Sequence, residues 1–415
     1  MGRTSGLLWA AASLVALGLT SALWAETQAV LDVCEDPSHW EASGEATFSK
    51  VEGRPGAGSA LRLQFTVERE KAPAFVHRPI RGDPTWELPE GGLSLWLKGD
   101  GSAGFFAVEL VDSSFKHRYA ALLPLKETDW HRADLPWREF VPEIYHPGAE
   151  PLPLYHPTGG LKPSILFNLF LGRWFYAKPF EPYQVSIDDI TLETGLPFDT
   201  TDYTPSAAGL PRTLAKLRGK EPVTIVCMGD SLTFGVGAGG PSGAYPGKLE
   251  ALLRQRFGYE KVTVVNSGVG GLEVPQGSVL IPRDVVPYDP DLVTVLYGYN
   301  DLAPGGVTRD QFKTAVSVFV DRVRRLTKGR AEVLLVSSLP GTSDDAWERL
   351  KAGAETIREL AQEKRCGLCD ADAAFRALGR EKLIAEYFRE KDPAHPNPRG
   401  QELLTNLLLE AIVGK

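Results

Sequence analysis

One short segment constrains this chain more than any other, a buried strand that ends in a serine. The run 223–228 is apolar and β-branched, and it stops at Gly229-Asp230-Ser231. Enzymes with parallel sheets place polar side chains in this way, at the carboxyl end of a central strand. Small polar residues after a strand also form ordinary turns. Ser231 is therefore a candidate nucleophile whose role depends on the rest of the chain.

Length and composition limit the class of protein. With 415 residues the chain exceeds one ordinary hydrophobic core, so we expect two domains. Charged residues make up 24% and hydrophobic residues 43%, as in globular proteins. The net charge of −8, without a cluster of Lys and Arg, argues against nucleic-acid binding.

The first 25 residues have the pattern of a secretory signal peptide. Arg3 precedes an apolar run over residues 7–19, and Ala25 stands before polar Glu26. We predict cleavage after Ala25 and a secreted or periplasmic protein. Because the apolar run is nearly long enough to span a bilayer, an uncleaved membrane anchor is the alternative. We expect no later membrane-spanning segment.

Residues 30–195 are expected to form an all-β domain. Segments 60–67, 92–98, 106–111 and 183–192 alternate apolar and polar residues, and Gly-rich turns separate them. Such alternation is typical of half-buried antiparallel strands. It predicts a β-sandwich of the jelly-roll type.

Segments 128–135 and 185–192 resemble galactose-binding-like jelly rolls found beside carbohydrate-active enzymes, which implies a glycan-binding role. Six tryptophans could stack on sugar rings, although large aromatic residues more often fill a core: Trp40, Trp86, Trp96, Trp130, Trp137 and Trp174. The proline-rich segment 147–163 is expected to be a long loop near the active site. Asp188 and Asp189 could bind Ca²⁺, but we expect a solvated pair on an edge strand.

The cysteines are too few for a disulfide framework: Cys34, Cys227, Cys366 and Cys369. Neither a second cysteine pair nor a histidine lies near Cys366 and Cys369 to complete a zinc site. We expect buried thiols, with a local Cys366–Cys369 disulfide as the alternative. We predict that the protein uses no metal and no cofactor.

The second half of the chain has a different pattern of apolar and polar residues. Residues 196–209 are polar and unperiodic and form the expected linker, and residues 210–415 alternate strand-like and helix-like segments. A capping box opens a helix at Thr308, and Asn397-Pro398 opens the last one. The pattern predicts a three-layer, flavodoxin-like α/β domain with a parallel sheet covered on both faces. The predicted strands cover residues 223–228, 261–266, 291–297, 331–337 and 367–370.

Three further polar blocks stand where predicted strands end or the last helix starts. They cover residues 266–271, 298–301 and 392–396. Together with residues 229–232 they resemble, in order, the four blocks of the SGNH or GDSL hydrolases, over about residues 220–413. The order of domains resembles that of two-domain carbohydrate esterases.

A serine hydroxyl needs a base, and His395 is the only histidine after residue 156. Asp392, three residues earlier, can accept the imidazole N–H and fix the tautomer. We therefore predict the catalytic triad Ser231, His395 and Asp392. The alternatives for Asp392 and His395 are a loop pair that caps the last helix or part of a metal site. A metal would need more ligands than one histidine supplies.

The resemblance also implies an oxyanion hole made by the backbone N–H groups of Ser231 and Gly271 and the amide of Asn300. The choice of Gly271 over Gly268 and Gly270 rests on aligning Asn266 with the family block. The alternative for Asn300 is ordinary turn chemistry.

Three residues beside these predicted groups have other expected roles. We interpret Asp230 and Asp301 as structural hydrogen-bonders. Tyr299, at a variable position of the family block, could touch substrate or core.

These features predict a secreted serine esterase that removes O-acyl groups, above all O-acetyl, from a carbohydrate through an acyl-enzyme. A lipase-like or aryl esterase, or a sugar O-acyltransferase, would use the same site. A non-catalytic glycan-binding scaffold with a vestigial site is the alternative from another class.

Overall fold

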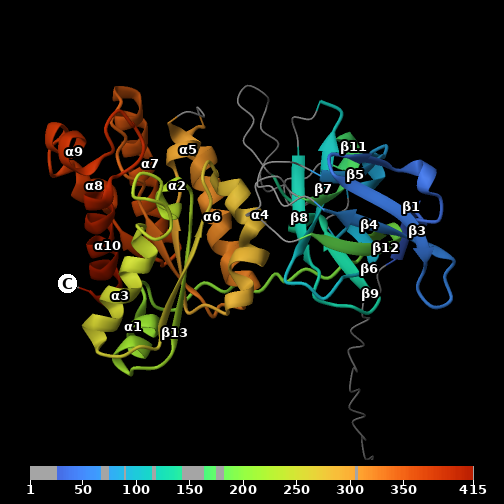
Figure 1. The fold of residues 1–415 in the computed structure, drawn as a ribbon, viewed down its shortest axis with the longest axis horizontal. Coiled ribbons are helices and arrows are strands. Elements are labelled where there is room, and N and C mark those ends of the chain that lie inside the picture. The colour runs from blue at the N-terminus through green and yellow to red at the C-terminus, as the bar shows by residue number, and fades with distance from the viewer. Residues whose placement is uncertain are drawn as a thin grey trace, which may run out of the picture.

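A computed structural model describes residues 26–66, 74–87, 90–114, 118–142, 163–173, 182–303 and 307–414. These residues form an antiparallel β-sandwich followed by an α/β domain, which confirms the predicted fold class (Figure 1). The predicted signal peptide, Trp174 and most of the proline-rich segment lie outside the described residues. Within the described part, no helix is long and apolar enough to cross a membrane.

The sandwich consists of two sheets of six strands. In the first sheet the order is β3-β4-β12-β6-β9, with β1 also paired to β12. Its strands are β1 (Glu26–Asp32), β3 (Ala46–Glu52), β4 (Ser59–Phe65), β6 (Gly92–Lys98), β9 (His131–Pro136) and β12 (Tyr183–Thr194). The second sheet has the order β10-β8-β7-β11-β5-β2. Its strands are β2 (Glu41–Ser43), β5 (Ala74–Pro79), β7 (Phe105–Asp112), β8 (Arg118–Pro124), β10 (Val141–Pro142) and β11 (Leu166–Arg173).

The sandwich core explains part of the tryptophan content. Trp40 and Trp137 are buried among the aliphatic side chains between the two sheets, as expected of core residues. Trp86, Trp96 and Trp130 are only partly buried. The Trp96 ring is covered by the guanidinium of Arg54, whose Cζ lies 4.8 Å from the ring centroid. Four single-turn 3-10 helices complete this region: η1 (Pro37–His39), η2 (Pro84–Trp86), η3 (Trp137–Glu139) and η4 (Pro163–Ile165).

The expectation that Asp188 and Asp189 are a solvated pair on an edge strand is wrong. Their strand, β12, lies between β4 and β6, and Asp188 is only 2% exposed. Arg54 forms ion pairs with both carboxylates. Burial and the neighbouring Asp189 raise the pKa of Asp188, and Arg54 opposes that rise. Arg54 thus supplies the positive charge that a bound cation would bring, and the described residues contain no cluster suited to a metal ion.

The α/β domain has a five-stranded parallel sheet with the order β14-β13-β15-β16-β17. The strands are β13 (Val223–Gly229), β14 (Val262–Gly268), β15 (Leu292–Leu296), β16 (Glu332–Val336) and β17 (Gly367–Cys369). The helices are α1 (Pro211–Arg218), α2 (Ser231–Phe234), α3 (Tyr245–Phe257), α4 (Val274–Asp284), η5 (Val286–Tyr288), α5 (Tyr299–Leu302), α6 (Arg309–Leu326), α7 (Asp344–Glu363), α8 (Ala371–Arg376), α9 (Arg380–Tyr387) and α10 (Pro398–Val413).

Apolar helix faces cover both sides of this sheet, as predicted. Side chains of α4, α6 and α7 pack on one face, and those of α1, α3 and α10 pack on the other. The predicted helix starts are also confirmed: Thr308 and Gln311 form a capping box, and Asn397 caps α10. All four cysteines are buried and free, so the alternative Cys366–Cys369 disulfide does not form.

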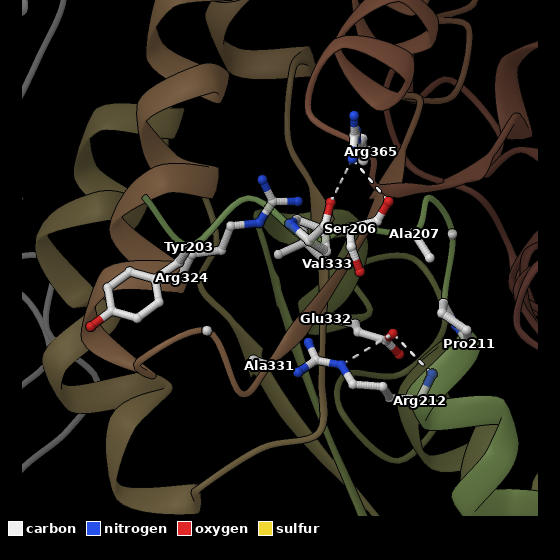
Figure 2. A pocket seen from close by; sticks show the side chains of 13 residues that line it. Tyr203, Ser206, Ala207, Pro211, Arg212, Arg324, Ala331, Glu332, Val333 and Arg365 are labelled. Carbon is white, nitrogen blue, oxygen red and sulfur yellow. Dashed lines mark hydrogen bonds and ion pairs between the residues drawn. The ribbon is translucent and has the colours of Figure 1, made fainter. Parts of the chain in front are cut away.

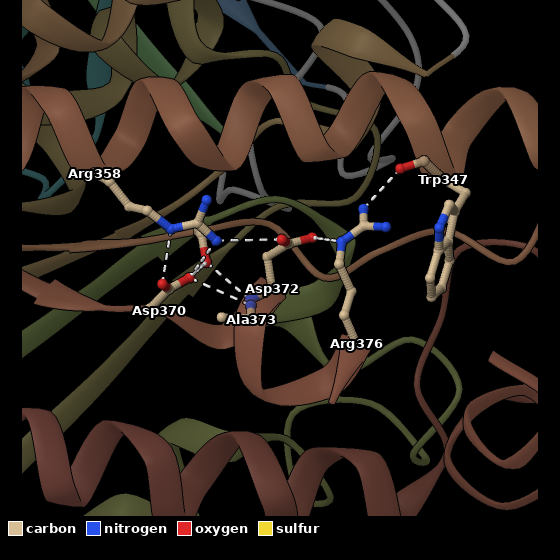
Figure 3. A network of polar contacts seen from close by, with 7 residues as sticks. Trp347, Arg358, Asp370, Asp372, Ala373 and Arg376 are labelled. Atoms are coloured by element: carbon tan, nitrogen blue, oxygen red, sulfur yellow. Dashed lines mark hydrogen bonds and ion pairs between the residues drawn. The ribbon is translucent and has the colours of Figure 1, made fainter. Parts of the chain in front are cut away.

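A polar network braces the helices that follow β16 and β17 (Figure 3). Arg358 of α7 donates to Asp370 at 2.7 Å, and Arg376 of α8 donates to Asp372 at the same distance. Arg376 also donates to the carbonyl of Trp347. Because Asp372 is almost fully buried, this network holds α7 and α8 in place beside the carboxyl edge of the sheet.

The two domains meet where the second sheet of the sandwich contacts α4 (Figure 1). Beside this contact, Glu139 of the first domain pairs with two arginines of α6. Its Oε2 accepts from Arg322 at 2.9 Å and from Arg325 at 2.9 Å. Arg322 is only 5% exposed, and Glu139 supplies a carboxylate opposite its buried guanidinium. Burial alone would raise the pKa of Glu139, but the two arginines outweigh it and hold this pKa below its ordinary value.

We expect Glu139→Gln to lower the free energy of unfolding at pH 7 by about 2 to 5 kcal/mol, because Arg322 loses its buried partner. The contribution should be present above the ordinary glutamate pKa of about 4.3 and disappear as the pH falls through the lower folded value. Urea unfolding of wild type and variant between neutral and acid pH measures both effects. Glu348→Gln, on the exposed side of α7, is the control for loss of one charge. Equal stability of Glu139→Gln and wild type at pH 7 would contradict this view of the interface.

Candidate active site

Ser231 lies at the carboxyl edge of the sheet because the chain turns sharply after β13. A side chain at Gly229 would have its Cβ 2.6 Å from the carbonyl oxygen of Leu296, so only glycine fits at this strand end. Asp230 then caps α2, its Oδ1 accepting from the N–H of Leu232 at 2.8 Å. The turn presents Ser231 as the first residue of α2.

The structure brings Ser231, His395 and Asp392 together. Nε2 of His395 lies 2.9 Å from Oγ of Ser231, and Nδ1 lies 2.9 and 3.0 Å from the two carboxylate oxygens of Asp392. Burial alone would raise the pKa of Asp392. The N–H groups of Ala394 and His395 and the imidazole hold it below its ordinary value. An ionised Asp392 fixes the proton on Nδ1 and leaves the lone pair of Nε2 facing the serine hydroxyl.

The loop that carries His395 has its own backbone support. The N–H of Arg389 donates to the carbonyl of His395 at 3.0 Å, and Phe388 forms an antiparallel bridge with Pro396. Asp392 and His395 do not cap α10, since the side chain of Asn397 does so. The alternative of a helix-capping pair is therefore wrong.

A buried glutamine joins the two halves of this site, and sequence reasoning missed it. Gln401 of α10 is fully buried. Its Nε2 donates to the carbonyl of Leu232 at 3.0 Å, and its Oε1 accepts from the N–H of Tyr245 at 3.0 Å. Leu232 directly follows Ser231, and α10 begins three residues after His395. Gln401 thus fixes the turn that carries Ser231 against the segment that carries His395. The available signal was a polar residue within the apolar stripe of α10.

Of the predicted oxyanion donors, Ser231 begins α2, Gly271 lies in the loop after β14, and Asn300 lies in the short helix α5 after β15. Nδ2 of Asn300 donates one hydrogen to the carbonyl of Leu272 at 2.9 Å, and its second hydrogen remains for another acceptor. The N–H of Gly268 donates to Oδ1 of Asn266, so this N–H is already used and does not serve an oxyanion. Gly270 is close to the nucleophile, because a Cβ there would lie 3.9 Å from Cβ of Ser231. Gly271 follows with a φ of +81°, and its role as a donor stays a prediction.

Two buried carboxyls lie behind the nucleophile turn. Asp301 accepts from the N–H of Val274 at 2.9 Å, and Asp230 accepts from Leu232, as expected of structural hydrogen-bonders. Burial, with a contribution from Asp301, raises the pKa of Asp230 to about 7. Tyr299 is half-buried and packs on the core of α4 and α6.

Two aromatic residues lie near the candidate site. Burial and the charge of Asp392 raise the pKa of Tyr299. Phe234, three residues after the nucleophile on α2, is 38% exposed. Sequence reasoning did not single out Phe234, since its exposure depends on the packing of α2.

Comparison with known proteins places these features in a family. Residues 227–403 match the GDSL-like Lipase/Acylhydrolase family. An acetylxylan esterase from Geobacillus stearothermophilus is 24% identical over 208 residues, which cover 45% of this chain and 93% of that protein.

Among solved structures, the lipase/acylhydrolase from Enterococcus faecalis is 22% identical with a TM-score of 0.40. The match covers 46% of this chain and 96% of the chain from Enterococcus faecalis. The acetyl xylan esterase AlAXEase is 20% identical, also with a TM-score of 0.40, and covers 46% of this chain and all of its own. Residues 227–403 are thus a GDSL/SGNH hydrolase domain, and the protein is a carboxylic ester hydrolase.

Proposed function

We propose that this protein is a secreted or periplasmic serine esterase that hydrolyses O-acetyl esters on a carbohydrate. Ser231 is the nucleophile, His395 the general base and Asp392 the residue that orients it. The observation that carries the proposal is the 2.9 Å contact between Nε2 of His395 and Oγ of Ser231, with Asp392 on the opposite ring nitrogen. This is the arrangement that a serine needs to become a nucleophile near neutral pH.

In the first half of the reaction, Oγ of Ser231 attacks the ester carbonyl carbon while Nε2 of His395 takes the hydroxyl proton. The negative charge on the carbonyl oxygen is stabilised by the N–H groups of Ser231 and Gly271 and by Nδ2 of Asn300. The C–O bond to the sugar then breaks, and His395 gives its proton to the departing sugar oxygen. The acetyl group is left on Ser231.

In the second half, water replaces the sugar hydroxyl. His395 takes a proton from this water, whose oxygen attacks the acetyl carbon through the same oxyanion site. Acetate leaves when the bond to Oγ breaks, and His395 returns the proton to Ser231. Asp392, held ionised by its hydrogen bonds, stabilises the imidazolium in both halves.

Three observations support a carbohydrate substrate. The relative that is 24% identical over most of its own length is named an acetylxylan esterase. The preceding domain is a β-sandwich. The glycan-binding jelly rolls that it resembles have the same class of fold. The signal-peptide pattern supports secretion. Phe234 offers an exposed aromatic ring one turn from the nucleophile, suited to contact with a sugar ring.

We expect the purified protein to release acetate from acetylated xylan and acetylated sugars, and to cleave long-chain esters far more slowly. Ser231→Ala should reduce release about 1000-fold or more in a folded protein, because the other site groups cannot replace the nucleophile. Release of the carboxylic acid, acetate or fatty acid, over a panel of acetylated polysaccharides, aryl acetates and long-chain esters measures this preference.

Other outcomes of the panel would favour the alternatives. Preference for long chains indicates a lipase-like enzyme, and faster transfer to an added sugar than to water indicates an acyltransferase. A folded protein without activity on any ester indicates a glycan-binding scaffold. Activity of Ser231→Ala equal to that of wild type would remove Ser231 as the nucleophile.

We expect Gln401→Met to lower kcat about 10- to 100-fold with little change in KM, because the nucleophile turn and the base lose their common anchor. The control is Thr405→Val in the same helix. Thr405 is also fully buried, but its hydroxyl donates only within α10, to the carbonyl of Gln401. Steady-state kinetics on a soluble acetyl ester, with thermal unfolding of both variants, separate positioning from stability. If both variants lose kcat in proportion to their stability, Gln401 is only structural.

A further inference from the structure

A polar pocket lies at the opposite edge of the parallel sheet from Ser231. Its volume is about 230 Å³. The walls come from the linker residues 203–209, the start of α1, the end of α6, the first residues of β16, and Arg365 (Figure 2). The volume is several times that of a water molecule, so the pocket suits a small solute and excludes a polymer.

The deepest charged group of this pocket is Arg324 of α6, which is 4% exposed. Its Nη2 donates to the carbonyl of Lys364 at 2.6 Å and contacts Sγ of Cys366. Its Nη1 has no hydrogen-bond partner in the part of the chain that the structure describes. Figure 2 shows the guanidinium extending from α6 toward Ser206.

The other charges of the pocket leave an excess of positive charge. Arg365 donates from Nη1 to the carbonyls of Pro205 and Ser206. Glu332 is the one carboxylate among the lining residues, and it already accepts from the backbone N–H groups of Arg212 and Thr213 at the start of α1. Within the described residues, no carboxylate lies within ion-pair distance of Arg324 or Arg365.

Two other arginines of α6, Arg322 and Arg325, have the carboxylate partner that Arg324 lacks. Arg322 and Arg325 share the carboxylate of Glu139, which compensates their charges. Asp202 interacts electrostatically with Arg324, but it is exposed and forms no ion pair with it. A buried guanidinium without a paired carboxylate is costly, and the planar fork of arginine binds oxyanions through paired hydrogen bonds. We propose that this pocket binds a small oxyanion, of phosphate, sulfate or carboxylate chemistry, between Arg324 and Arg365. The bound anion fastens the linker to the α/β domain.

The test is thermal unfolding of the full chain in inorganic phosphate, sulfate or acetate, against chloride at equal ionic strength. A site that binds only the folded state raises Tm by about 3 to 6 °C when the anion is present at about ten times its Kd. A larger shift with phosphate and sulfate than with acetate identifies tetrahedral anions as the ligands, and the reverse order identifies carboxylates.

Arg324→Gln and Arg365→Ala should lose most of this shift. Arg349→Ala is the matched control, because Arg349 is exposed on α7 and pairs with Asp345. Its loss removes one positive charge and should leave the anion response unchanged. The pocket is remote from Ser231, so cleavage of a small acetyl ester should be equal in wild type and Arg365→Ala.

The proposal is overturned if wild type shows no shift up to about 50 mM phosphate, or if Arg324→Gln responds as wild type does. Ala207→Glu covers the case in which Arg324→Gln does not fold. Ala207 is an exposed lining residue of the linker, and glutamate there brings a carboxylate to the pocket. This variant should unfold at a higher temperature than wild type in chloride and lose its response to phosphate. An unchanged response would also overturn the proposal.

Discussion

The contact between Nε2 of His395 and Oγ of Ser231 is the interaction that the rest of the α/β domain maintains. It joins two residues 164 positions apart in the chain. Neither residue is placed by its own segment alone. The serine depends on the tight turn after β13, and the histidine depends on the loop between α9 and α10. Gln401 connects these two segments through hydrogen bonds in the protein interior, where they are strong and costly to lose.

Charged groups in the interior divide into those that are compensated and those that are not. Arg54 pairs with both carboxylates of the acidic pair in the first domain, and Glu139 pairs with two arginines at the domain interface. Hydrogen bonds from backbone N–H groups and from the imidazole stabilise the carboxylate of Asp392. Arg324 differs from these arginines, since no described carboxylate forms an ion pair with it and its Nη1 has no hydrogen-bond partner among the described residues. The role of each of these charged groups follows from the charges and hydrogen-bond partners that surround it.

The sequence was sufficient to predict those elements and residues whose positions depend on local patterns. Short runs of mainly apolar residues located the strands of the parallel sheet to within two residues, and caps located α6 and α10. The scarcity of histidines in the second half singled out His395. Strand order in the sandwich could not be read in the same way, because alternation reports which face a residue occupies and says nothing of the neighbouring strands. The edge-strand error for Asp188 and Asp189 has this origin. Gln401 and Arg324 were missed because their partners lie far away in the chain.

The most direct test of the proposed mechanism is the detection of the acyl-enzyme. The full-length protein would be mixed rapidly with an aryl acetate, quenched in acid and digested for mass spectrometry. The mechanism predicts a burst of phenol, and one acetyl group on the peptide that contains Ser231. The acetyl group should accumulate within milliseconds to seconds and disappear as the substrate is consumed. Hydrolysis that proceeds without a burst and with Ser231 unmodified, or with the acetyl group on another residue, would contradict the proposed mechanism.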